Sequence, residues 1–408
     1  MSKGSIVLLG LGMQGKAALY DLVNNSNASQ IIVADNRPDF ESYISRYPSD
    51  IVSARRIDAT DESELASVMR DADVIIEALP GSFALPVGRL AAKLGVSLVS
   101  SMYYLNPGEQ DAAKIRALEE ELRLVDREAK EKGATILTEF GMDPGIDLVL
   151  GAKALSEIDK LEEFYSYGAG FPALEAANNP IKYKFSWSVI GVMRAYLRPG
   201  KIISKGKVVD IDAMEMFARE NIHILDLKEI GAPLECYPNG NSVKYAELFG
   251  VRDSVREMGR YACRWTGHCA FWEIIAKSGF LDEKPIKVMD TLISPLEFMA
   301  SLLGSQEQFR YANEEQDVAL IRIDVRGALK GEKKRIVYQL IDRRDLETGF
   351  TSMQRTVGFT MSLGAQLILE GQLKKPGLLS PIEVPFDLVV RGLEKHGIQI
   401  SRQELPWE

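Results

Sequence analysis

The chain has 408 residues, of which 46% are apolar and 26% are charged, a balance typical of a globular protein with room for two or three domains. The formal net charge of −9 argues against non-specific nucleic-acid binding, which depends on clustered Lys and Arg. Apolar runs stay below the roughly 18 residues that cross a bilayer. From the charge we therefore expect no nucleic-acid partner, and from the short apolar runs no membrane partner.

Cysteine and histidine are rare in this chain. Cys236, Cys263 and Cys269 form no CxxC pair and predict no disulfide framework, which fits a reducing compartment. The three histidines lie far apart in the sequence, so we expect no metal site. The N-terminal residues pass directly into a strand pattern and show no cleavable signal. We therefore expect a cytoplasmic protein.

The first third of the chain alternates strand-like and helix-like segments. A continuous apolar run predicts a strand at residues 5–10, and further strands are predicted at residues 30–35, 55–60, 73–80, 96–101 and 134–140. Helical periodicity falls between them, at residues 16–25, 61–72, 83–95 and 107–132. Strands separated by helices imply right-handed crossovers and a parallel sheet. The sequence therefore predicts an α/β Rossmann domain with a doubly wound parallel sheet.

The pattern changes after residue 143. Residues 165–188 are rich in glycine, proline and aromatic side chains and have no clean period. Alternation in residues 317–329 and 334–342 predicts an antiparallel hairpin in a second α+β domain. Residues 352–371 form a helix so apolar that it must be buried, and we expect it to return to the first domain. The expected division is a Rossmann domain at 1–143, a second domain at 144–350 and a C-terminal segment packing on the first domain at 351–408.

The stretch GLGMQG ends the first strand and opens the first helix. Gly10 permits the tight turn, Gly12 lets the backbone approach a pyrophosphate, and Gly15 allows close packing of helix and strand. The amide groups of the first helical turn, which includes Met13 and Gln14, face the anion together with the positive end of the helix dipole. The turn predicts a dinucleotide cofactor.

An acidic residue stands at the end of the second strand, where a dinucleotide-binding domain recognises the adenosine ribose. Asp35 lies 20 residues after Gly15 and can accept hydrogen bonds from the ribose hydroxyls, which favours NAD. Asn36 and Arg37 follow, and Arg37 can attract a 2′-phosphate, so NADP stays possible. Further cofactor contacts are expected from the loops that follow the later strands, at Asp58, Ala59, Ala78, Leu79 and Ser100.

Several longer stretches resemble one family. TEFGMDPGIDLVL, NPIKYKFSWSVIGVM, CRWTGH and the tail from GFTMSLG onward are similar to the saccharopine dehydrogenase family, which also includes lysine 6-dehydrogenases. The resemblance covers nearly the whole chain. It implies a Rossmann domain, a second domain with a mixed sheet and a C-terminal helix that returns to the first domain. It also implies a homodimer and a role in lysine metabolism.

The resemblance also implies a reaction and its residues. In this family NAD(P)-linked oxidation of an amine beside a carboxylate gives an imine, and water splits saccharopine into glutamate and 2-aminoadipate semialdehyde. Ser101 and Met102 match positions that touch the substrate, and Asp143 matches an acid where cofactor and substrate meet. Ser186 matches a polar contact near the nicotinamide. Arg264 matches an arginine of the substrate cleft, suited to a forked carboxylate contact.

Two departures leave the substrate open. The family often has Pro-Arg where this chain has Val189 and Ile190, and an arginine where it has Gly240. Loss of the arginine partner of a carboxylate should weaken its binding by about 2 kcal/mol. A lysine 6-dehydrogenase or a related amine or opine dehydrogenase therefore remains an alternative to saccharopine oxidation. A non-catalytic NAD(P)-binding sensor is the alternative from another functional class.

Three residues are the catalytic candidates, each with a structural alternative. Asp143 can stabilise the amine cation, or it can simply shape an Asp-Pro-Gly turn at a helix start. His268 can act as the base for water attack, or it can be an ordinary loop residue. Tyr103 follows the fifth strand, where it can pass a proton or pack beneath the cofactor.

Overall fold

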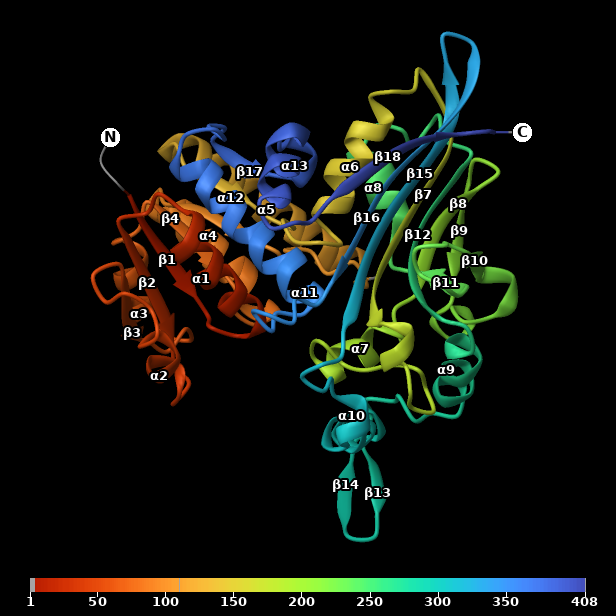
Figure 1. The fold of residues 1–408 in the computed structure, drawn as a ribbon, viewed down its shortest axis with the longest axis horizontal. Coiled ribbons are helices and arrows are strands. Elements are labelled where there is room, and N and C mark those ends of the chain that lie inside the picture. The colour runs from red at the N-terminus through yellow and green to blue at the C-terminus, as the bar shows by residue number, and fades with distance from the viewer. Residues whose placement is uncertain (1–3, 110, 408) are drawn as a thin grey trace. The chain divides into compact units, whose positions relative to one another are not determined.

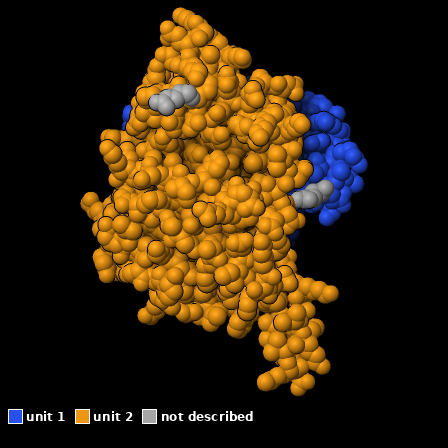
Figure 2. Space-filling model, turned by 90° about the vertical axis from the view of Figure 1, so that its right-hand side faces the viewer, with its two compact units in different colours: residues 1–149, 354–397 blue, residues 150–353, 398–408 orange. Residues whose placement is uncertain are grey.

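The computed structural model describes residues 4–109 and 111–407. The chain divides into two compact units, drawn as a ribbon in Figure 1 and in two colours in Figure 2. Unit 1 contains Met1–Val149 and Gln354–Gly397, and unit 2 contains Leu150–Met353 and Ile398–Glu408.

Unit 1 is built on a parallel sheet with the strand order β17-β6-β5-β4-β1-β2-β3. Its strands are β1 Ser5–Leu9, β2 Gln30–Asp35, β3 Val52–Arg56, β4 Val74–Glu77, β5 Ser97–Ser100, β6 Thr135–Leu137 and β17 Gly377–Leu379. The order from β3 to β6 is that of a Rossmann domain, so the predicted fold class is confirmed. The third strand was predicted at residues 55–60 but ends at Arg56, because Asp58 forms a local turn with Thr60 that stops the strand.

Helices cover both faces of this sheet. The helices of the first 132 residues are α1 Met13–Asn25, α2 Phe40–Ile44, α3 Glu62–Met69, η1 Gly81–Phe83, α4 Ala84–Leu94 and α5 Ala112–Lys132. Gly95 and Gly133 end α4 and α5 in the left-handed conformation, at φ of 75° and 74°. Apolar residues of α3, α4 and α5 join one buried cluster with alternate residues of the strands. Within the described residues, no helix has both the length and the apolarity needed to cross a bilayer.

The apolar segment after residue 351 is helical, as predicted, and it returns to unit 1. It consists of α11 Ser352–Gln354, a π-helical turn η6 Arg355–Phe359 and α12 Thr360–Leu369. The π-helical turn packs closely on α1: a Cβ atom on Gly358 would lie 2.6 Å from the Cβ atom of Ala17. The short helix η7 Pro381–Glu383 and then α13 Phe386–Glu394 follow in the same unit.

Unit 2 is built on a mixed sheet with the order β10-β11-β12-β7-β15-β16-β18. Its strands are β7 Lys160–Pro172, β10 His223–Leu225, β11 Leu234–Pro238, β12 Glu257–Trp265, β15 Asp317–Leu329, β16 Glu332–Arg343 and β18 Ile400–Leu405. Strands β12 and β7 run parallel, whereas the other neighbours in this order are antiparallel. The pair β8 Gly200–Ser204 and β9 Lys207–Ile211 joins through β12. The mixed sheet and the β15–β16 hairpin confirm two predictions.

Two parts of unit 2 differ from the expected pattern. The aperiodic stretch 165–188 contains the end of the long strand β7, which the sequence did not reveal because both faces of that strand are buried. The expected C-terminal segment 351–408 is shared between the units, since β18 pairs with β16 in unit 2.

The remaining elements of unit 2 lie around its sheet (Figure 1). They are α6 Ile146–Leu155, which begins in unit 1, and η2 Leu174–Ala176, α7 Val189–Ala195, η3 Ala213–Glu215, η4 Arg219–Asn221, α8 Ser242–Leu248, α9 His268–Lys277, α10 Pro295–Ser305 and η5 Glu307–Phe309. A separate hairpin of β13 Ile286–Val288 and β14 Thr291–Ile293 projects beyond α10 in Figure 1.

The prediction that the cysteines form no disulfide is wrong. Cys236 on β11 and Cys263 on β12 face each other directly across the antiparallel pair, with Cα atoms 4.0 Å apart, and they form a disulfide. Cys269 is a buried free thiol. The two paired cysteines are 27 residues apart, and only the strand register brings them together.

Candidate functional site

The glycine turn of unit 1 has the geometry of a phosphate-binding turn. Gly10 has φ of +91°, and a Cβ atom there would lie 2.7 Å from the carbonyl oxygen of Ala78. A Cβ atom on Gly15 would lie 2.1 Å from the carbonyl oxygen of Gly10. At Gly12, by contrast, no described atom lies within 4 Å of the Cβ position. The turn is therefore tightly packed against the protein at Gly10 and Gly15, whereas at Gly12 the space beside the backbone is open.

The first turn of α1 lies directly behind Gly12. Gly12 is the N-cap residue and, having no side chain, supplies no capping oxygen to the amide groups of the first turn. Met13 and Gln14 open this turn, and the Gln354 side chain donates to the carbonyl oxygen of Met13 at 3.0 Å. An α-helix leaves its first amide groups without intrahelical acceptors, and an anion satisfies them. These residues therefore fit the pyrophosphate of a dinucleotide.

Asp35 is buried at the end of β2 and is bound to the glycine turn. Its Oδ2 accepts from the amide of Leu11 at 2.6 Å, and its Oδ1 accepts from the amide and Nε of Arg37 at 2.8 and 3.1 Å. Burial alone would raise the pKa of Asp35, but these hydrogen bonds hold it below its ordinary value. Arg56 donates to the carbonyl oxygens of Asn36 and Arg37, at 2.9 and 3.2 Å. Two arginines therefore stand beside the carboxylate that was expected to bind ribose.

The loop after β3 is organised by its own acid. Asp58 is exposed and accepts from the amide and hydroxyl of Thr60, at 2.9 and 2.7 Å. Its amide donates to Oε2 of Glu64 at 2.8 Å. The hydrogen bonds from Thr60 lower the pKa of Asp58, so the carboxylate is ionised. Ala59 is half-buried in the same turn. Their expected contact with the adenine stays a prediction.

The loops after β4 and β5 lie beside the glycine turn. Ala78 and Leu79 are the nearest neighbours of Gly10. Ser100 is buried, and the amide of Met102 donates to its hydroxyl oxygen at 3.0 Å. Ser101 is half-buried in the same loop, as is Tyr103, which stands just past Met102. These expected cofactor and substrate positions thus come from adjacent strand ends.

Asp143 belongs to a tight turn between β6 and α6. The amide of Gly141 donates to the carbonyl oxygen of Pro144 at 3.1 Å, and the amide of Ile146 donates to that of Gly141 at 3.0 Å. A Cβ atom on Gly141 would lie 3.0 Å from the Cβ atom of Ser101. The turn therefore brings the half-buried Asp143 to the end of β5. Pro144 precedes the first helical residue, Ile146, by two positions.

Arg264 is a buried cation on β12 in unit 2. Its Nη1 donates to the carbonyl oxygen of Cys263 at 2.8 Å, and its guanidinium carbon lies 5.0 Å from the centre of the Tyr183 ring. Its Nε has no hydrogen-bond partner among the described residues. Burial by itself lowers the pKa of the guanidinium, but Tyr237, Tyr183 and Tyr196 raise it above its ordinary value. Arg264 is therefore charged.

His268 is the first residue of α9 and is enclosed by aromatic rings. Its ring centre lies 5.5 Å from that of Tyr196, 5.9 Å from that of Tyr183 and 6.1 Å from that of Tyr237, with which it is nearly parallel at 4°. Burial, and then the positive charge of Arg264, place the pKa of His268 well below its ordinary value. A neutral imidazole can accept a proton.

Together these side chains form what we call the arginine cage. It comprises five residues that each carry a buried nitrogen or oxygen atom with no hydrogen-bond partner in the described part of the chain: Arg264, His268, Tyr183, Tyr196 and Trp272. Buried polar groups are normally hydrogen-bonded, so a cluster of unsatisfied ones is suited to bind a polar ligand that supplies the missing partners. Arg264 and His268 were predicted from the sequence, whereas the other three were not. Tyr183 lies within the stretch NPIKYKFSWSVIGVM and Tyr196 three residues after it, so that stretch was the available signal.

Ser186 is buried, with 5% of its surface exposed, in the segment that leads into α7. The cage residue Tyr196 directly follows α7. The expected nicotinamide contact of Ser186 stays a prediction. In the described ranges no group of three or more His, Cys, Asp or Glu side chains is placed to hold a metal ion.

Comparison with known proteins identifies the family. The saccharopine dehydrogenase C-terminal domain matches residues 141–398, and the saccharopine dehydrogenase NADP binding domain matches residues 6–137. The chain belongs to the saccharopine dehydrogenase family. The resemblance seen in GMDPG, KFSWS and CRWTGH is thereby confirmed.

Individual family members show how far the likeness extends. The NADP(+)-linked, L-glutamate-forming saccharopine dehydrogenase of Saccharomyces cerevisiae is 23% identical over 463 residues, covering 98% of this chain and 99% of the relative. An alpha-aminoadipic semialdehyde synthase of Arabidopsis thaliana is 26% identical over 427 residues, but this chain spans only 38% of its length. The solved apo saccharopine dehydrogenase of S. cerevisiae superposes with a TM-score of 0.82 at 24% identity, covering 99% of this chain and 100% of the other. That likeness shows a shared fold.

Proposed function

We propose that this member of the saccharopine dehydrogenase family is an NADP-dependent oxidoreductase. Its proposed reaction is oxidation of the CH–NH bond of an amino-acid-derived secondary amine such as saccharopine, giving glutamate and 2-aminoadipate semialdehyde. The observation that carries this proposal is Arg264, a charged and buried guanidinium with an unsatisfied Nε, surrounded by further unsatisfied polar atoms. A substrate carboxylate satisfies such a group. The activity for which the NADP(+)-linked relatives are named supports the reaction type.

Each proposed residue has a defined task. The dinucleotide, when bound, supplies the hydride acceptor. The amide groups behind Gly12 hold its pyrophosphate. Arg264 binds the carboxylate beside the reacting amine, and the neutral imidazole of His268 takes a proton from the water that splits the imine. Asp143 stabilises the amine cation by its negative charge, and Tyr103 relays protons at the end of β5.

The cofactor preference makes a first testable prediction. Arg37 and Arg56 stand where a 2′-phosphate would follow the ribose, and Asp35 is already engaged by Leu11 and Arg37. We expect Arg37→Ala to lower kcat/KM for NADP by about tenfold, as for the loss of one charged hydrogen bond, with little change for NAD. Steady-state kinetics with both nucleotides measures this.

Arg55→Ala is the matched control. Arg55 directly precedes Arg56 on β3. Successive side chains of a strand point to opposite faces of the sheet, so Arg55 points away from the face of Arg56, and it forms an ion pair with Asp71 at 3.5 Å. Arg55→Ala should leave kcat/KM unchanged for both NADP and NAD. If Arg37→Ala lowers kcat/KM equally for NAD and NADP, Arg37 does not contact the 2′-phosphate, and NAD becomes the expected cofactor again.

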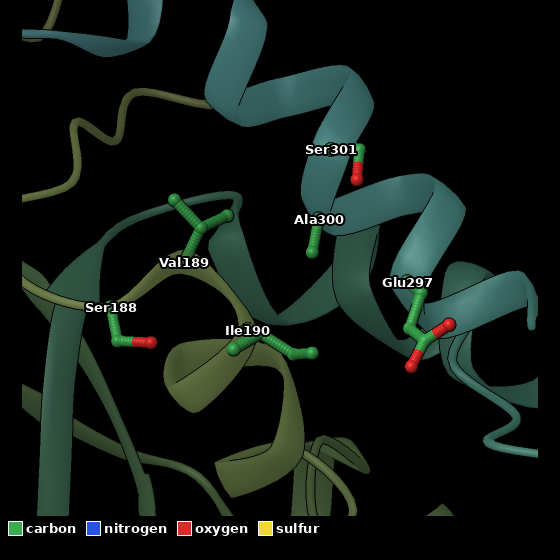
Figure 3. A pocket seen from close by; sticks show the side chains of 6 residues that line it. All are labelled: Ser188, Val189, Ile190, Glu297, Ala300 and Ser301. Atoms are coloured by element: carbon green, nitrogen blue, oxygen red, sulfur yellow. The ribbon is translucent and has the colours of Figure 1, made fainter. Parts of the chain in front are cut away.

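A second candidate function, a lysine 6-dehydrogenase or related amine dehydrogenase, is favoured by one observation. A surface pocket of about 470 Å³ that is wide open to solvent is lined by Ser188, Val189, Ile190, Glu297, Ala300 and Ser301 (Figure 3). Val189 and Ile190 occupy the Pro-Arg position of the family, and Glu297 is the charged side chain in the lining. A carboxylate attracts an ammonium group and repels a substrate carboxylate.

A panel of substrates separates these functions. Purified protein is mixed with NADP or NAD and with saccharopine, lysine, or other amines and opines, and absorbance of the reduced nicotinamide is followed. Turnover of saccharopine supports the main proposal, and turnover of lysine alone supports the second. If nucleotide binds but every amine fails, the protein is a non-catalytic sensor. The homodimer and the cytoplasmic location stay predictions, which light scattering and cell fractionation test.

A further inference from the structure

A buried carboxyl group lies between the loops that follow β4 and β5. Glu77 is the last residue of β4, and its side chain has no exposed surface. Its Oε1 accepts from the amide of Leu79 at 2.9 Å, and its Oε2 accepts from the hydroxyl of Ser100 at 2.6 Å. The Ser100 oxygen in turn accepts from the amide of Met102 at 3.0 Å. One carboxyl group thus holds both loops.

These two loops carry the positions assigned above to cofactor and substrate. Leu79 lies against Gly10 of the phosphate-binding turn: a Cβ atom on Gly10 would be 3.2 Å from a methyl group of Leu79. On the other side, the carbonyl oxygen of Met102 accepts from the amide of Glu139, two residues before the GMDPG turn starts. All of these residues lie in unit 1. A change at Glu77 therefore reaches the nucleotide turn through Leu79 and the substrate loop through Met102.

The hydrogen-bond pattern depends on the charge of Glu77. In the ionised form each hydrogen atom in the chain has one acceptor, since Leu79 and Ser100 donate to the carboxylate and Met102 donates to Ser100. A proton on Oε2 would face the serine hydrogen, so the serine hydroxyl would have to turn away. The protonated form is accessible, because burial raises the pKa of Glu77 to about 7, although the Ser100 and Leu79 hydrogen bonds oppose this rise.

Beside Glu77 the described chain places the Leu79 amide, the Ser100 hydroxyl and the Tyr104 side chain. The Tyr104 hydroxyl is buried and has no hydrogen-bond partner among described residues. Burial, and then the negative charge of Glu77, raise the pKa of Tyr104 well above its ordinary value, so it stays neutral. None of these three groups carries a positive charge.

We propose that Glu77 is a positioning residue whose ionised form fixes the β4 and β5 loops for nucleotide binding, so that protonation of Glu77 weakens the binding of NADPH. This inference rests on the proposed nucleotide site, but not on the identity of the amine substrate. It gives the protein a built-in dependence of nucleotide affinity on pH near neutrality.

The test measures NADPH binding by its fluorescence, without any amine, between about pH 5.5 and 8.5, a range that brackets the transition of Glu77. Glu77→Gln keeps the shape of the side chain but at every pH places an N–H donor against either the Ser100 hydroxyl or the Leu79 amide, which are both donors. We expect it to bind NADPH about five- to tenfold more weakly than the wild type at high pH, equivalent to one lost hydrogen bond, and equally well at low pH. Protonation of the NADPH phosphates affects the variant and the wild type alike, so it cancels in the ratio of their dissociation constants at each pH.

Ser100→Ala gives an independent readout if Glu77→Gln folds poorly. The serine hydrogen bond lowers the pKa of Glu77, so its removal should move the pH transition upward. Glu119→Gln, an exposed acid on α5, is the control and should match the wild type. The inference would be overturned if the pH transition of NADPH affinity persisted in Glu77→Gln, or if it kept its midpoint in Ser100→Ala. Tighter NADPH binding by the wild type at low pH than at high pH, relative to Glu77→Gln, would also overturn it.

The outcomes also separate this inference from the proposed reaction. If the wild type binds NADPH with the expected pH dependence but oxidises no amine, the reaction fails and the role of Glu77 stands. If the wild type turns over amine with a nucleotide affinity that is flat across the range, the role of Glu77 fails and the reaction stands. If it binds no nucleotide, both are overturned.

Discussion

Gly12→Ala is expected to abolish most nucleotide binding while leaving the protein as stable as the wild type. No described atom lies within 4 Å of the position that the new methyl group would take, so the apo protein accommodates it. That open position faces the amide groups of the first turn of α1, where the pyrophosphate must approach. Loss of one or two charged hydrogen bonds should weaken NADPH binding on the order of 10- to 100-fold. Isothermal titration and a thermal melt measure the two effects.

Gly15→Ala is the matched comparison three residues away. Its methyl group would lie 2.1 Å from the carbonyl oxygen of Gly10, so the backbone must shift. We expect a loss of stability of about 2 kcal/mol even after the gain in helix propensity. That corresponds to a fall in Tm of roughly 4–8 °C. If Gly12→Ala melts early, or if it binds NADPH normally, the turn does not hold the pyrophosphate in the way proposed.

The parts of the fold that sequence could predict depend on local patterns. Apart from β3, which is largely polar, the strands of unit 1 that alternate with helices are mainly apolar, and that pattern predicts a parallel sheet without knowledge of tertiary contacts. The glycine turn was recognisable because Gly10 and Gly15 must each lack a side chain for reasons that lie within a few residues of chain. The hairpin of β15 and β16 shows its alternation in the sequence for the same reason.

Features that depend on contacts between distant segments were not predictable. Strand β7 is buried on both faces and carries small and aromatic residues, so no alternation marks it. The disulfide of Cys236 and Cys263 requires the register of β11 and β12. Glu77 was likewise not predicted as a site residue, although a charged residue at the end of an otherwise apolar strand is a usable signal.

The candidate site shows the same division. Arg264 and His268 were found because the CRWTGH stretch resembles the family, and the structure places both in one cage. Tyr183, Tyr196 and Trp272 complete that cage from α9 and from positions before and after α7, and only packing brings them together. A sequence can thus indicate the charged members of a site, whereas the neutral residues that set their pKa values come from tertiary structure.

Arg264→Met is expected to reduce amine oxidation strongly without destabilising the protein. The substitution removes the charge that binds the substrate carboxylate, and loss of one partner from a buried charge pair costs at least about 2.7 kcal/mol, or roughly 100-fold in kcat/KM. In the free protein, however, Arg264 is a buried cation with an unsatisfied Nε, so its replacement by an apolar side chain should leave Tm unchanged or raise it. A purely structural arginine would show the opposite change in Tm.

Two further measurements sharpen this prediction. The positive charge of Arg264 lowers the pKa of His268, so Arg264→Met should move the acid limb of the pH–rate profile to higher pH. Arg322→Met is the matched control, because Arg322 is also a buried arginine of unit 2 with one hydrogen bond, to Gln339 at 2.7 Å, and an Nε that lacks a partner among described residues, but it lies outside the cage. It should retain kcat/KM per folded molecule. Full activity in Arg264→Met, or an equal loss in Arg322→Met, would exclude the arginine cage as the carboxylate site and leave the substrate of this dehydrogenase fold to be sought elsewhere in unit 2.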